Sequence, residues 1–384
     1  MKIFYWAPFN TRTGVVDKVL NSIQAIKKYG NSNINITLLN ATGEWNDSAN
    51  KLKFINANIL NLLNFNLKLI SDKRGFFWSR FYYFLIFILC FLPLFKVLKK
   101  EKPDYLFCQL VTSLPLFISL FFFKNTKFIL NISGFPKIHF LRSCFWKLTS
   151  KKIYKICCPT ENTFNYILSL NIFDPKKIIL LKDPIFNISE INKQKKEIIE
   201  EKLVNEKFIL SVGRLTYQKN HKILINAFKK ISINYPELKL VILGDGEKED
   251  ELLNLINNLG IKNKVLLLGY KKNIYNYISN SLCVINTSLW EDPGFVMIMS
   301  AASNKIFISS DCPSGPADFI GRDEKAGYLF TNNSFNSLVE IILKFLKEDK
   351  NKILNKVIIA KKRSNDYTFF KFFLSFRNNF IDNS

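Results

Sequence analysis

The sequence predicts an α/β fold of two Rossmann-like, doubly wound domains. In the second half, the apolar runs FILSVGR, LKLVILGD, KVLLLGY, CVINTS and KIFISSD each precede a helical or turn-rich stretch. This alternation is typical of a parallel sheet that binds ligands at the carboxyl ends of its strands. In the first half, a strand over Lys2–Trp6, a helix over Val15–Tyr29 and a strand over Asn35–Asn40 predict a second such sheet. Its further strands are expected over Tyr105–Leu110, Lys127–Ile132 and Ile153–Pro159.

The length of 384 residues suits two domains, each with a hydrophobic core of its own. Two sheets in one chain imply a cleft between the domains. In chain order we expect an N-terminal domain over residues 1–184, a polar inter-domain connection over 185–206, a second domain over 207–365 and, over 366–384, an aromatic helix that packs back across the cleft.

The net charge of +24, from 55 basic and 31 acidic residues, favours anionic partners. Two explanations stay open, a dedicated basic patch and a solvated lysine surface. Nucleic acid is disfavoured as a partner, because the sequence shows no recognition module and no clustered aromatic and basic motif.

The seven cysteines are odd in number, stand mostly in apolar runs and show no metal-ligand spacing. The chain has only two histidines, so no metal site is expected. The cysteines are therefore interpreted as reduced, buried thiols of a cytoplasmic protein. Met1 runs directly into the first strand, and we expect no signal peptide.

An uncharged run of 15 residues, Phe81–Phe95, raises the question of a membrane. A spanning helix needs about 20 apolar residues and is usually basic on one side only. This run has basic residues on both sides, at Lys73, Arg74, Arg80, Lys96, Lys99 and Lys100. The pattern suits a helix in the membrane interface or a buried core helix, and it disfavours a transmembrane span.

The segment SVGRLTYQKNHKILINAF carries the first candidate site. A strand ends at Gly213, Arg214 and Lys219 flank a short loop, and a helix starts near Asn220. Glycine lets the backbone approach a ligand, a helix start offers free N–H groups, and two cations can neutralise a diphosphate. The sequence predicts an anion site here, although an isolated pair of charges at a strand end is usually solvated.

The segment NTSLWEDPGFVMIMSAASNKIFISSDCPSGPADFIG carries the second candidate site. Glu291 follows a strand end in a turn with Pro293 and Gly294, where the next helix starts. A carboxylate beside free helix amides can accept sugar hydroxyls while the amides hold phosphate oxygens. Taken alone, a glutamate in a loop is usually solvated.

These motifs make the second half resemble the donor domain of glycosyltransferase family four, the large retaining family of the GT-B fold. VGRL…QKN matches the arginine-lysine motif of the family, and SLWEDPGFVMI…SSDCPSGPADFI matches its glutamate motif. Between them, LGDGEKEDELLNLINNLGIKNKVLLLGY matches the next two strands. The resemblance is close over Phe208–Phe330 and looser in the first half, through the opening strand–loop–helix, NISGFPKI and CCPTENTFNYI.

The resemblance implies catalytic roles for Arg214, Lys219 and Glu291. Arg214 and Lys219 would hold the donor diphosphate and support its departure, and Glu291 would bind hydroxyls of the transferred sugar. No metal and no cofactor are expected, because the two cations take the place of a metal ion and the co-substrate is a nucleotide sugar, UDP- or GDP-linked. Transfer would retain the anomeric configuration.

The resemblance further implies donor binding by Gly14, Gly213, Tyr270, Gly294, Phe295 and Val296. In the family pattern, Phe295 and Val296 present backbone amides to the sugar and phosphate. Tyr270 lies where the nucleotide base docks, and Gly14 approaches the diphosphate and the acceptor.

Two positions depart from the family pattern. The second glutamate of the motif, which grips the ribose, is Met299 here, and a thioether accepts hydrogen bonds poorly. Where many members have His-Gly, this chain has Ser133-Gly134, with His139 five residues further on. Ser133 and His139 are the candidates on the acceptor side, and a structural role for His139 stays open.

The sequence thus predicts a retaining glycosyltransferase that moves a sugar onto a saccharide or lipid-linked acceptor in bacterial surface polysaccharide or lipopolysaccharide synthesis. We expect a cytoplasmic protein, peripherally associated with the anionic inner face of the cytoplasmic membrane. Two alternatives remain, a nucleotide-sugar-binding protein that lost transfer with the glutamate at position 299, and a sugar-nucleotide epimerase of the same fold.

Overall fold

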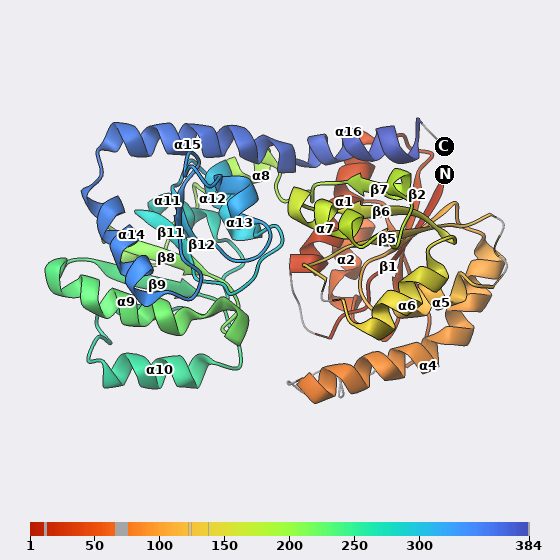
Figure 1. Cartoon of the computed structure of the whole chain (residues 1–384), viewed down its shortest axis with the longest axis horizontal. Coiled ribbons are helices and arrows are strands. Elements are labelled where there is room, and N and C mark those ends of the chain that lie inside the picture. The colour runs from red at the N-terminus through yellow and green to blue at the C-terminus, as the bar shows by residue number, and fades with distance from the viewer. Residues whose placement is uncertain (11–13, 66–75, 122, 124, 137, 383–384) are drawn as a thin grey trace. The chain divides into compact units, whose positions relative to one another are not determined.

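The computed structural model describes residues 1–10, 14–65, 76–121, 123, 125–136 and 138–382 (Figure 1). Lys73 and Arg74, two of the basic residues before the apolar run, lie outside the described residues. The chain forms two compact units, one of Met1–Pro184 with Phe369–Ser384 and one of Ile185–Thr368.

The first unit is built on a parallel sheet of seven strands in the order β3-β2-β1-β4-β5-β6-β7. The strands are β1 (Lys2–Trp6), β2 (Asn35–Asn40), β3 (Asn58–Asn61), β4 (Tyr105–Cys108), β5 (Lys127–Asn131), β6 (Ile153–Cys158) and β7 (Ile178–Leu180). The chain adds β2 and β3 on one side of β1 and then returns to the other side with β4. The topological switch point, where open α/β sheets bind ligands, therefore lies between β1 and β4.

Helices cover both faces of the first sheet. One face carries α1 (Gly14–Tyr29), α2 (Ala49–Phe54) and α16 (Phe369–Phe380). The other carries α4 (Phe76–Glu101) and α5 (Ser113–Ile118), while α6 (Phe140–Thr149) and α7 (Glu161–Ser169) pack by β5, β6 and β7. Two 3₁₀ turns, η1 (Asn46–Ser48) and η2 (Pro175–Lys177), complete the unit.

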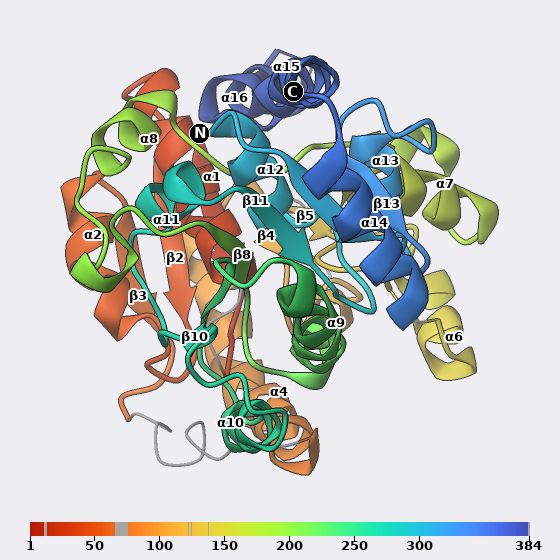
Figure 2. The same cartoon turned by 90° about the vertical axis from the view of Figure 1, so that its left-hand side faces the viewer.

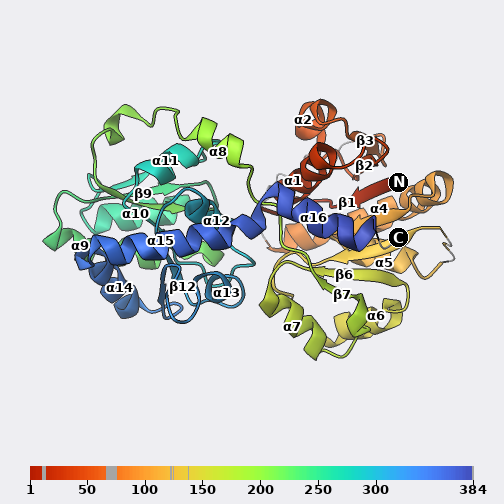
Figure 3. The ribbon, with the colours of Figure 1, turned by 90° about the horizontal axis from the view of Figure 1, so that it is seen from above.

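The terminal helix α16 packs against α1 in the first unit (Figure 3). Its phenylalanines at four-residue spacing, Phe372, Phe376 and Phe380, form one buried face. Tyr105 Oη in the sheet donates to the carbonyl oxygen of Phe380 at 3.0 Å. The last residues of the chain are thus part of the core of the first unit.

The second unit is built on a parallel sheet of six strands in the order β10-β9-β8-β11-β12-β13. The strands are β8 (Phe208–Val212), β9 (Lys239–Leu243), β10 (Val265–Leu267), β11 (Cys283–Asn286), β12 (Phe307–Ser310) and β13 (Tyr328–Phe330). By the same reasoning, its switch point lies between β8 and β11.

Helices also cover both faces of the second sheet (Figure 2). One face carries α9 (His221–Asn234), α10 (Glu249–Asn258) and α14 (Phe335–Lys347). The other carries α8 (Ile188–Gln194), α11 (Tyr275–Asn280), α12 (Phe295–Ala302), α13 (Pro316–Ile320) and α15 (Lys350–Ser364). The 3₁₀ turns are η3 (Glu201–Leu203), η4 (Tyr217–Lys219) and η5 (Asn365–Tyr367). Two Rossmann-like units confirm the predicted fold class.

Residues 185–206, expected as a connection between the domains, are part of the second unit. Ile185, Phe186, Ile191 and Leu203 are buried in the cluster on the α12 face of the second sheet. The sequence pattern made the segment look polar, because these few buried apolar residues are spread among lysines and glutamates. The short edge strands β3, β7 and β13 were not predicted.

Helix α4 runs well beyond the predicted apolar segment and is half-buried. Tyr82, Ile86, Cys90, Leu94 and Leu98 face the core at four-residue spacing. The opposite side is exposed, so α4 is a core helix on one side and presents an apolar surface on the other. By length and composition, Arg80–Glu101 is the one helix of the described chain that could cross a membrane, a test that core helices of soluble proteins also pass.

Candidate active site

The carboxyl edge of the second sheet brings the loops after β8 and β9 into close contact. The N–H of Gly213 donates to the carbonyl oxygen of Leu243 at 2.9 Å, and the N–H of Leu215 donates to that of Asp245 at 2.8 Å. A Cβ at Gly244, where φ is +138°, would lie 2.0 Å from Gly213 O, so only glycine fits there. The loop after β8 is therefore fixed by its neighbour.

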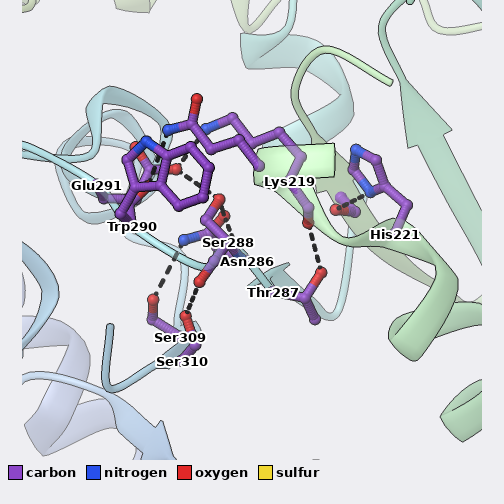
Figure 4. A network of polar contacts seen from close by, with 11 residues as sticks. Lys219, His221, Asn286, Thr287, Ser288, Trp290, Glu291, Ser309 and Ser310 are labelled. Carbon is purple, nitrogen blue, oxygen red and sulfur yellow. Dashed lines mark hydrogen bonds and ion pairs between the residues drawn. The ribbon is translucent and has the colours of Figure 1, made fainter. Parts of the chain in front are cut away.

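An ion pair between Lys219 and Glu291 occupies the switch point of this sheet (Figure 4). Lys219 ends the loop after β8, and Glu291 stands on the loop after β11. Both side chains are largely buried, with 17% and 11% of their surface exposed. A Cβ at Gly213 would lie 3.1 Å from Lys219 Cδ, so this glycine makes room for the lysine stem.

Hydrogen bonds from the end of β11 hold the glutamate in place. Ser288 Oγ donates to Glu291 Oε1 at 2.7 Å, and Thr287 Oγ1 donates to the carbonyl oxygen of Lys219 at 2.9 Å. Gln218 Nε2 donates to the carbonyl oxygen of Trp290 at 2.8 Å, which ties the two loops together. These contacts use Oε1, and no described residue forms a hydrogen bond or ion pair with Oε2 of the carboxylate.

Arg214 supplies the excess positive charge of the site. It is exposed on the loop after β8, and no described residue forms an ion pair or hydrogen bond with its guanidinium. The charge of Lys219 is balanced by Glu291, so Arg214 remains as an open cation at the same edge. A guanidinium in this state is suited to bidentate binding of phosphate oxygens.

The amino end of α12 lies beside the ion pair. Gly294 is its N-cap with φ +94°, and no side chain caps the helix. A Cβ at Gly294 would lie 3.8 Å from Glu291 Cβ. Phe295 and Val296, the first residues of the helix, carry N–H groups that have no acceptor inside it. The helix start therefore adds partial positive charge to the site.

Tyr270 and Met299 lie at the margins of the site. Tyr270 is exposed after β10, and its N–H donates to Asp245 Oδ1 at 2.7 Å. Met299 is one turn after Phe295 on α12, and its side chain is partly buried against the cluster on that face of the sheet. Its thioether therefore packs on the core instead of standing free in solvent.

The candidate residues fall into both units. Eight lie in the second, namely Gly213, Arg214, Lys219, Tyr270, Glu291, Gly294, Phe295 and Val296. The other three lie in the first unit. Gly14 is the exposed first residue of α1, and Ser133 follows β5 with an Oγ that has no partner among the described residues. His139 is exposed at the amino end of α6.

Sequence reasoning missed the side chains that position the ion pair, chiefly Ser288, Thr287 and Gln218. Their signal was their place within NTSLWED and TYQKN, next to the motif residues. Among the described residues, no three His, Cys, Asp or Glu side chains form a group that could hold a metal ion. Six of the seven cysteines are buried, and Cys144 is exposed.

His221 begins α9 directly after the loop. It is buried, and its Nδ1 lies 3.4 Å from Ser211 Oγ. Burial, together with the charge of Lys219, lowers the pKa of His221 to about 4, although hydrogen bonds with the backbone of Gly213 and Arg214 act in the opposite sense. The imidazole is therefore neutral at pH 7 and packs beneath the loop.

The profile of the family "Glycosyl transferases group 1" matches residues 192–364. The second unit belongs to this family. The match confirms the resemblance that the arginine-lysine and glutamate motifs predicted.

Two curated relatives are each 31% identical to this chain. One is an uncharacterized glycosyltransferase of Methanocaldococcus jannaschii, similar over 59% of this chain and 60% of its own length. The other is the N-acetylgalactosamine-N,N'-diacetylbacillosaminyl-diphospho-undecaprenol 4-alpha-N-acetylgalactosaminyltransferase of Campylobacter jejuni, similar over 60% of this chain and 63% of its own length. The similarity thus spans about three fifths of each relative.

Solved structures match this chain from end to end. A glycosyltransferase of Rickettsia africae superposes with a TM-score of 0.78 at 17% identity, over 100% of this chain and 99% of that one. Anabaena Alr3699/HepE in complex with UDP and glucose superposes with a TM-score of 0.74 at 16% identity, over 100% of both chains. At these identities the likeness establishes the fold, which is the predicted GT-B fold.

We predict that the stability of the second unit depends on the protonation of His221. Below its ordinary pKa of 6.5, the imidazole binds a proton in the unfolded chain, but in the folded chain only near pH 4. The free energy of unfolding should therefore fall as the pH drops through this range, by about 3 kcal/mol in total. Denaturant unfolding at a series of pH values measures this slope.

Substituting His221→Gln should remove this part of the slope. His139→Gln, a change in the only other histidine of the chain, is the matched control and should keep it. Equal slopes for the two variants would contradict a buried, neutral His221.

Proposed function

We propose that the protein is a retaining, metal-independent glycosyltransferase that moves a sugar from a nucleoside-diphosphate sugar to a saccharide or lipid-linked acceptor. The acceptor belongs to bacterial surface polysaccharide or lipopolysaccharide synthesis. The observation that carries the proposal is the Lys219–Glu291 ion pair beside the start of α12 at the switch point of the second sheet, with Arg214 exposed on the same loop as Lys219.

The chemistry of sugar transfer needs charge stabilisation at the leaving group. When the glycosidic bond breaks, negative charge grows on the diphosphate. Lys219 and Arg214, with the N–H groups of Phe295 and Val296, are placed to meet this charge without reorganisation of the protein. Arg214 and the helix start supply the counter-charge that a divalent metal ion would otherwise supply, and Lys219 adds to it while its charge is shared with Glu291.

Glu291 suits a different part of the donor. A carboxylate repels a diphosphate but accepts hydrogen bonds from sugar hydroxyls. Because Lys219 and Ser288 hold Oε1, the remaining oxygen is fixed in direction and can select the hydroxyl geometry of one hexose or aminosugar. With Met299 packed on the core, the ribose of the nucleotide would be bound by another group.

The names of relatives support this substrate class. One is the UDP-Gal:alpha-D-GlcNAc-diphosphoundecaprenol alpha-1,3-galactosyltransferase of Escherichia coli, 25% identical over 71% of this chain, and another is the Campylobacter jejuni enzyme. Both names specify α-linked products on lipid diphosphates, and an α-product from an α-linked donor is retention. UDP in the Anabaena complex favours UDP as the nucleotide.

We also propose that α4 holds the protein on the inner face of the cytoplasmic membrane. The side of α4 that faces away from the sheet exposes Phe81, Phe84, Ile88 and Leu92, each between 47% and 59%. Phe117 and Phe121 extend this apolar strip, and their rings lie 6.0 Å from that of Phe91 on α4. An exposed apolar surface of this kind is typical of a site that binds a partner protein or a membrane.

Charge argues for an anionic membrane as the partner of this strip. The described ends of α4 carry exposed basic residues, Arg80, Lys96, Lys99 and Lys100. A helix whose apolar side enters the acyl boundary and whose basic ends meet lipid phosphates lies in the interface plane. Since the other side of α4 forms the core of the first unit, the helix cannot enter a bilayer as a span without unfolding that core.

We predict that Arg214→Ala and Lys219→Ala each lower transfer at least tenfold while leaving the fold intact. Each removes a charge aimed at the leaving diphosphate, and a tenfold loss corresponds to about 1.4 kcal/mol. Arg214→Lys should also lose activity, because an ammonium cannot replace the guanidinium fork. The measurement is release of UDP from UDP-sugars in the presence of acceptor membranes. Arg322→Ala, a change in an exposed arginine of the same unit, is the control and should retain turnover.

Near-normal turnover of both alanine variants would contradict a diphosphate site at this loop. Absence of UDP release by the unmodified protein with every nucleotide sugar would contradict transfer itself.

We predict that the protein sediments with anionic vesicles and that Ile88→Ser combined with Leu92→Ser at least halves the bound fraction. Each substitution removes an apolar side chain from the exposed strip of α4. The matched control is Ile233→Ser with Leu253→Ser, two exposed positions of the same residue types on α9 and α10. Alkaline carbonate should release the bound protein. If only detergent releases it, α4 is inserted as a span and the proposal is wrong.

A further inference from the structure

The switch point of the first sheet holds a buried glutamine that the proposed mechanism does not use. Gln109 directly follows β4, and its N–H donates to the carbonyl oxygen of Trp6 in β1 at 3.0 Å. This bond continues the ladder between β1 and β4 by one residue. Because side chains alternate along a strand, Gln109 is on the same side as Tyr105 and Phe107, which is the side of α1.

The carboxamide of Gln109 is buried without a partner. The residue is 4% exposed, and neither Nε2 nor Oε1 has a hydrogen-bond partner among the described residues. A buried amide that forms no hydrogen bond destabilises the fold, and an apolar side chain of equal size would be preferred on stability alone. A glutamine that stabilises nothing at a ligand-binding edge indicates a binding role.

Two neighbouring strand ends present similar groups at the same edge. Asn10 follows β1 with Oδ1 buried and unpartnered, and Ser133 follows β5 with Oγ in the same state. Since β1 and β5 are the two strands that flank β4, three adjacent strand ends each supply an unused polar atom. Chance burial of one group does not account for three at one edge.

The backbone after Gln109 is strained, and a hydrogen bond from Trp6 holds it in place. Val111 has φ +47°, a conformation that β-branched residues rarely adopt. Its carbonyl oxygen accepts from Trp6 Nε1 at 3.2 Å, and Trp6 is fully buried. Strain of this kind persists where the surrounding structure holds a loop in a functional position. The same contact holds the backbone two residues after Gln109 against β1.

Among the described residues, the buried charges at this edge are paired with each other, which favours a neutral ligand group. Lys18 on α1 lies 2.8 Å from Asp183, and its Nζ also donates to the carbonyl oxygen of Ile132 at 3.0 Å. Both side chains are buried, so the lysine charge is already balanced. An amide, a hydroxyl and an amide oxygen suit a sugar hydroxyl or acetamido group, whereas a phosphate would need an open cation.

We propose that Gln109, with Asn10 and Ser133, forms a specificity subsite that reads a neutral hydroxyl or acetamido group of the acceptor saccharide. The proposal rests on the proposed glycosyltransferase function. Gln109 supplies two donors and one acceptor, which permits discrimination between epimers of one sugar hydroxyl.

The test is Gln109→Leu, which keeps the size of the side chain and removes its polar atoms. The melting temperature should rise by about 2–4 °C, because an unpartnered amide leaves the core. The probes are methyl glycosides of glucose, galactose and N-acetylglucosamine, which carry no alkyl chain that could bind the strip on α4. At least one of them should raise the melting temperature of the unmodified protein, and none should raise that of Gln109→Leu.

Gln194→Leu is the matched control, because Gln194 on α8 donates to Glu190 at 3.0 Å. It should gain no stability and should keep the response to the glycoside. A Gln109→Leu variant that is less stable than the unmodified protein, or that still responds to the glycoside, would overturn the subsite. So would an unmodified protein that responds to none of the three glycosides.

Thermal stabilisation by nucleotide sugars distinguishes a failure of the Gln109 subsite from a failure of the proposed glycosyltransferase function. Both the unmodified protein and Gln109→Leu should be stabilised by a UDP-sugar, because that site belongs to the second unit. If no nucleotide sugar stabilises either protein, the proposed function fails, whatever the glycosides show. If the UDP-sugar response is present and Gln109→Leu keeps its glycoside response, only the subsite fails.

Discussion

The ion pair between Lys219 and Glu291 is the constraint on which the candidate site depends. Removing two charges from water costs several kcal/mol per ion, and only close geometry with further hydrogen bonds offsets that cost. The sequence meets this need with Gly213, which admits the lysine stem, and with Ser288, which donates to the carboxylate. The loops after β8 and β11 are thereby held together, and Arg214 is the cation of this site that no described residue pairs.

The two sheets share one topology but differ in the chemistry of their switch points. In each, the chain builds outward on one side and then returns to the other, which opens a crevice at the carboxyl edge. The crevice of the second sheet is charged, through Arg214 and the Lys219–Glu291 pair. In the first, the described residues around Gln109 are polar, and the charge of Lys18 is balanced by Asp183. This difference suits a donor that carries a diphosphate and an acceptor group that carries hydroxyls.

Much of the second unit could be predicted from the sequence. The strands β8 to β12 are buried on both faces and read as continuous apolar runs, so their positions and the glycines after them were recognisable. Arg214, Lys219 and Glu291 were predicted as site residues because they stand in loops at strand ends and match the two motifs of the family. The comparisons do not test their roles, and these stay predictions.

Other features depend on three-dimensional context that a sequence pattern does not carry. The edge strands β7 and β13 have three residues each, too few to show a period, and they were not recognised as apolar runs. The run Phe81–Phe95 is apolar all round, so only the packing of α4 shows which side is buried. In the sequence, Gln109 cannot be told from any other polar residue that follows a strand. Its burial arises only when α1 and β1 pack beside it. The role of Ser288, which donates a hydrogen bond to Glu291, likewise depends on the contact between the loops after β8 and β11.

The most direct test of the central claim is a double-mutant cycle on donor turnover with Lys219→Met, Glu291→Gln and the double variant. UDP release from the best UDP-sugar is measured for all four proteins, with circular dichroism as the check on folding. If the pair acts as one unit, the double variant should be at least about tenfold faster than the product of the two single losses predicts, a coupling of at least about 1.4 kcal/mol. Losses that simply multiply would contradict the account, because the two side chains would then act independently of each other.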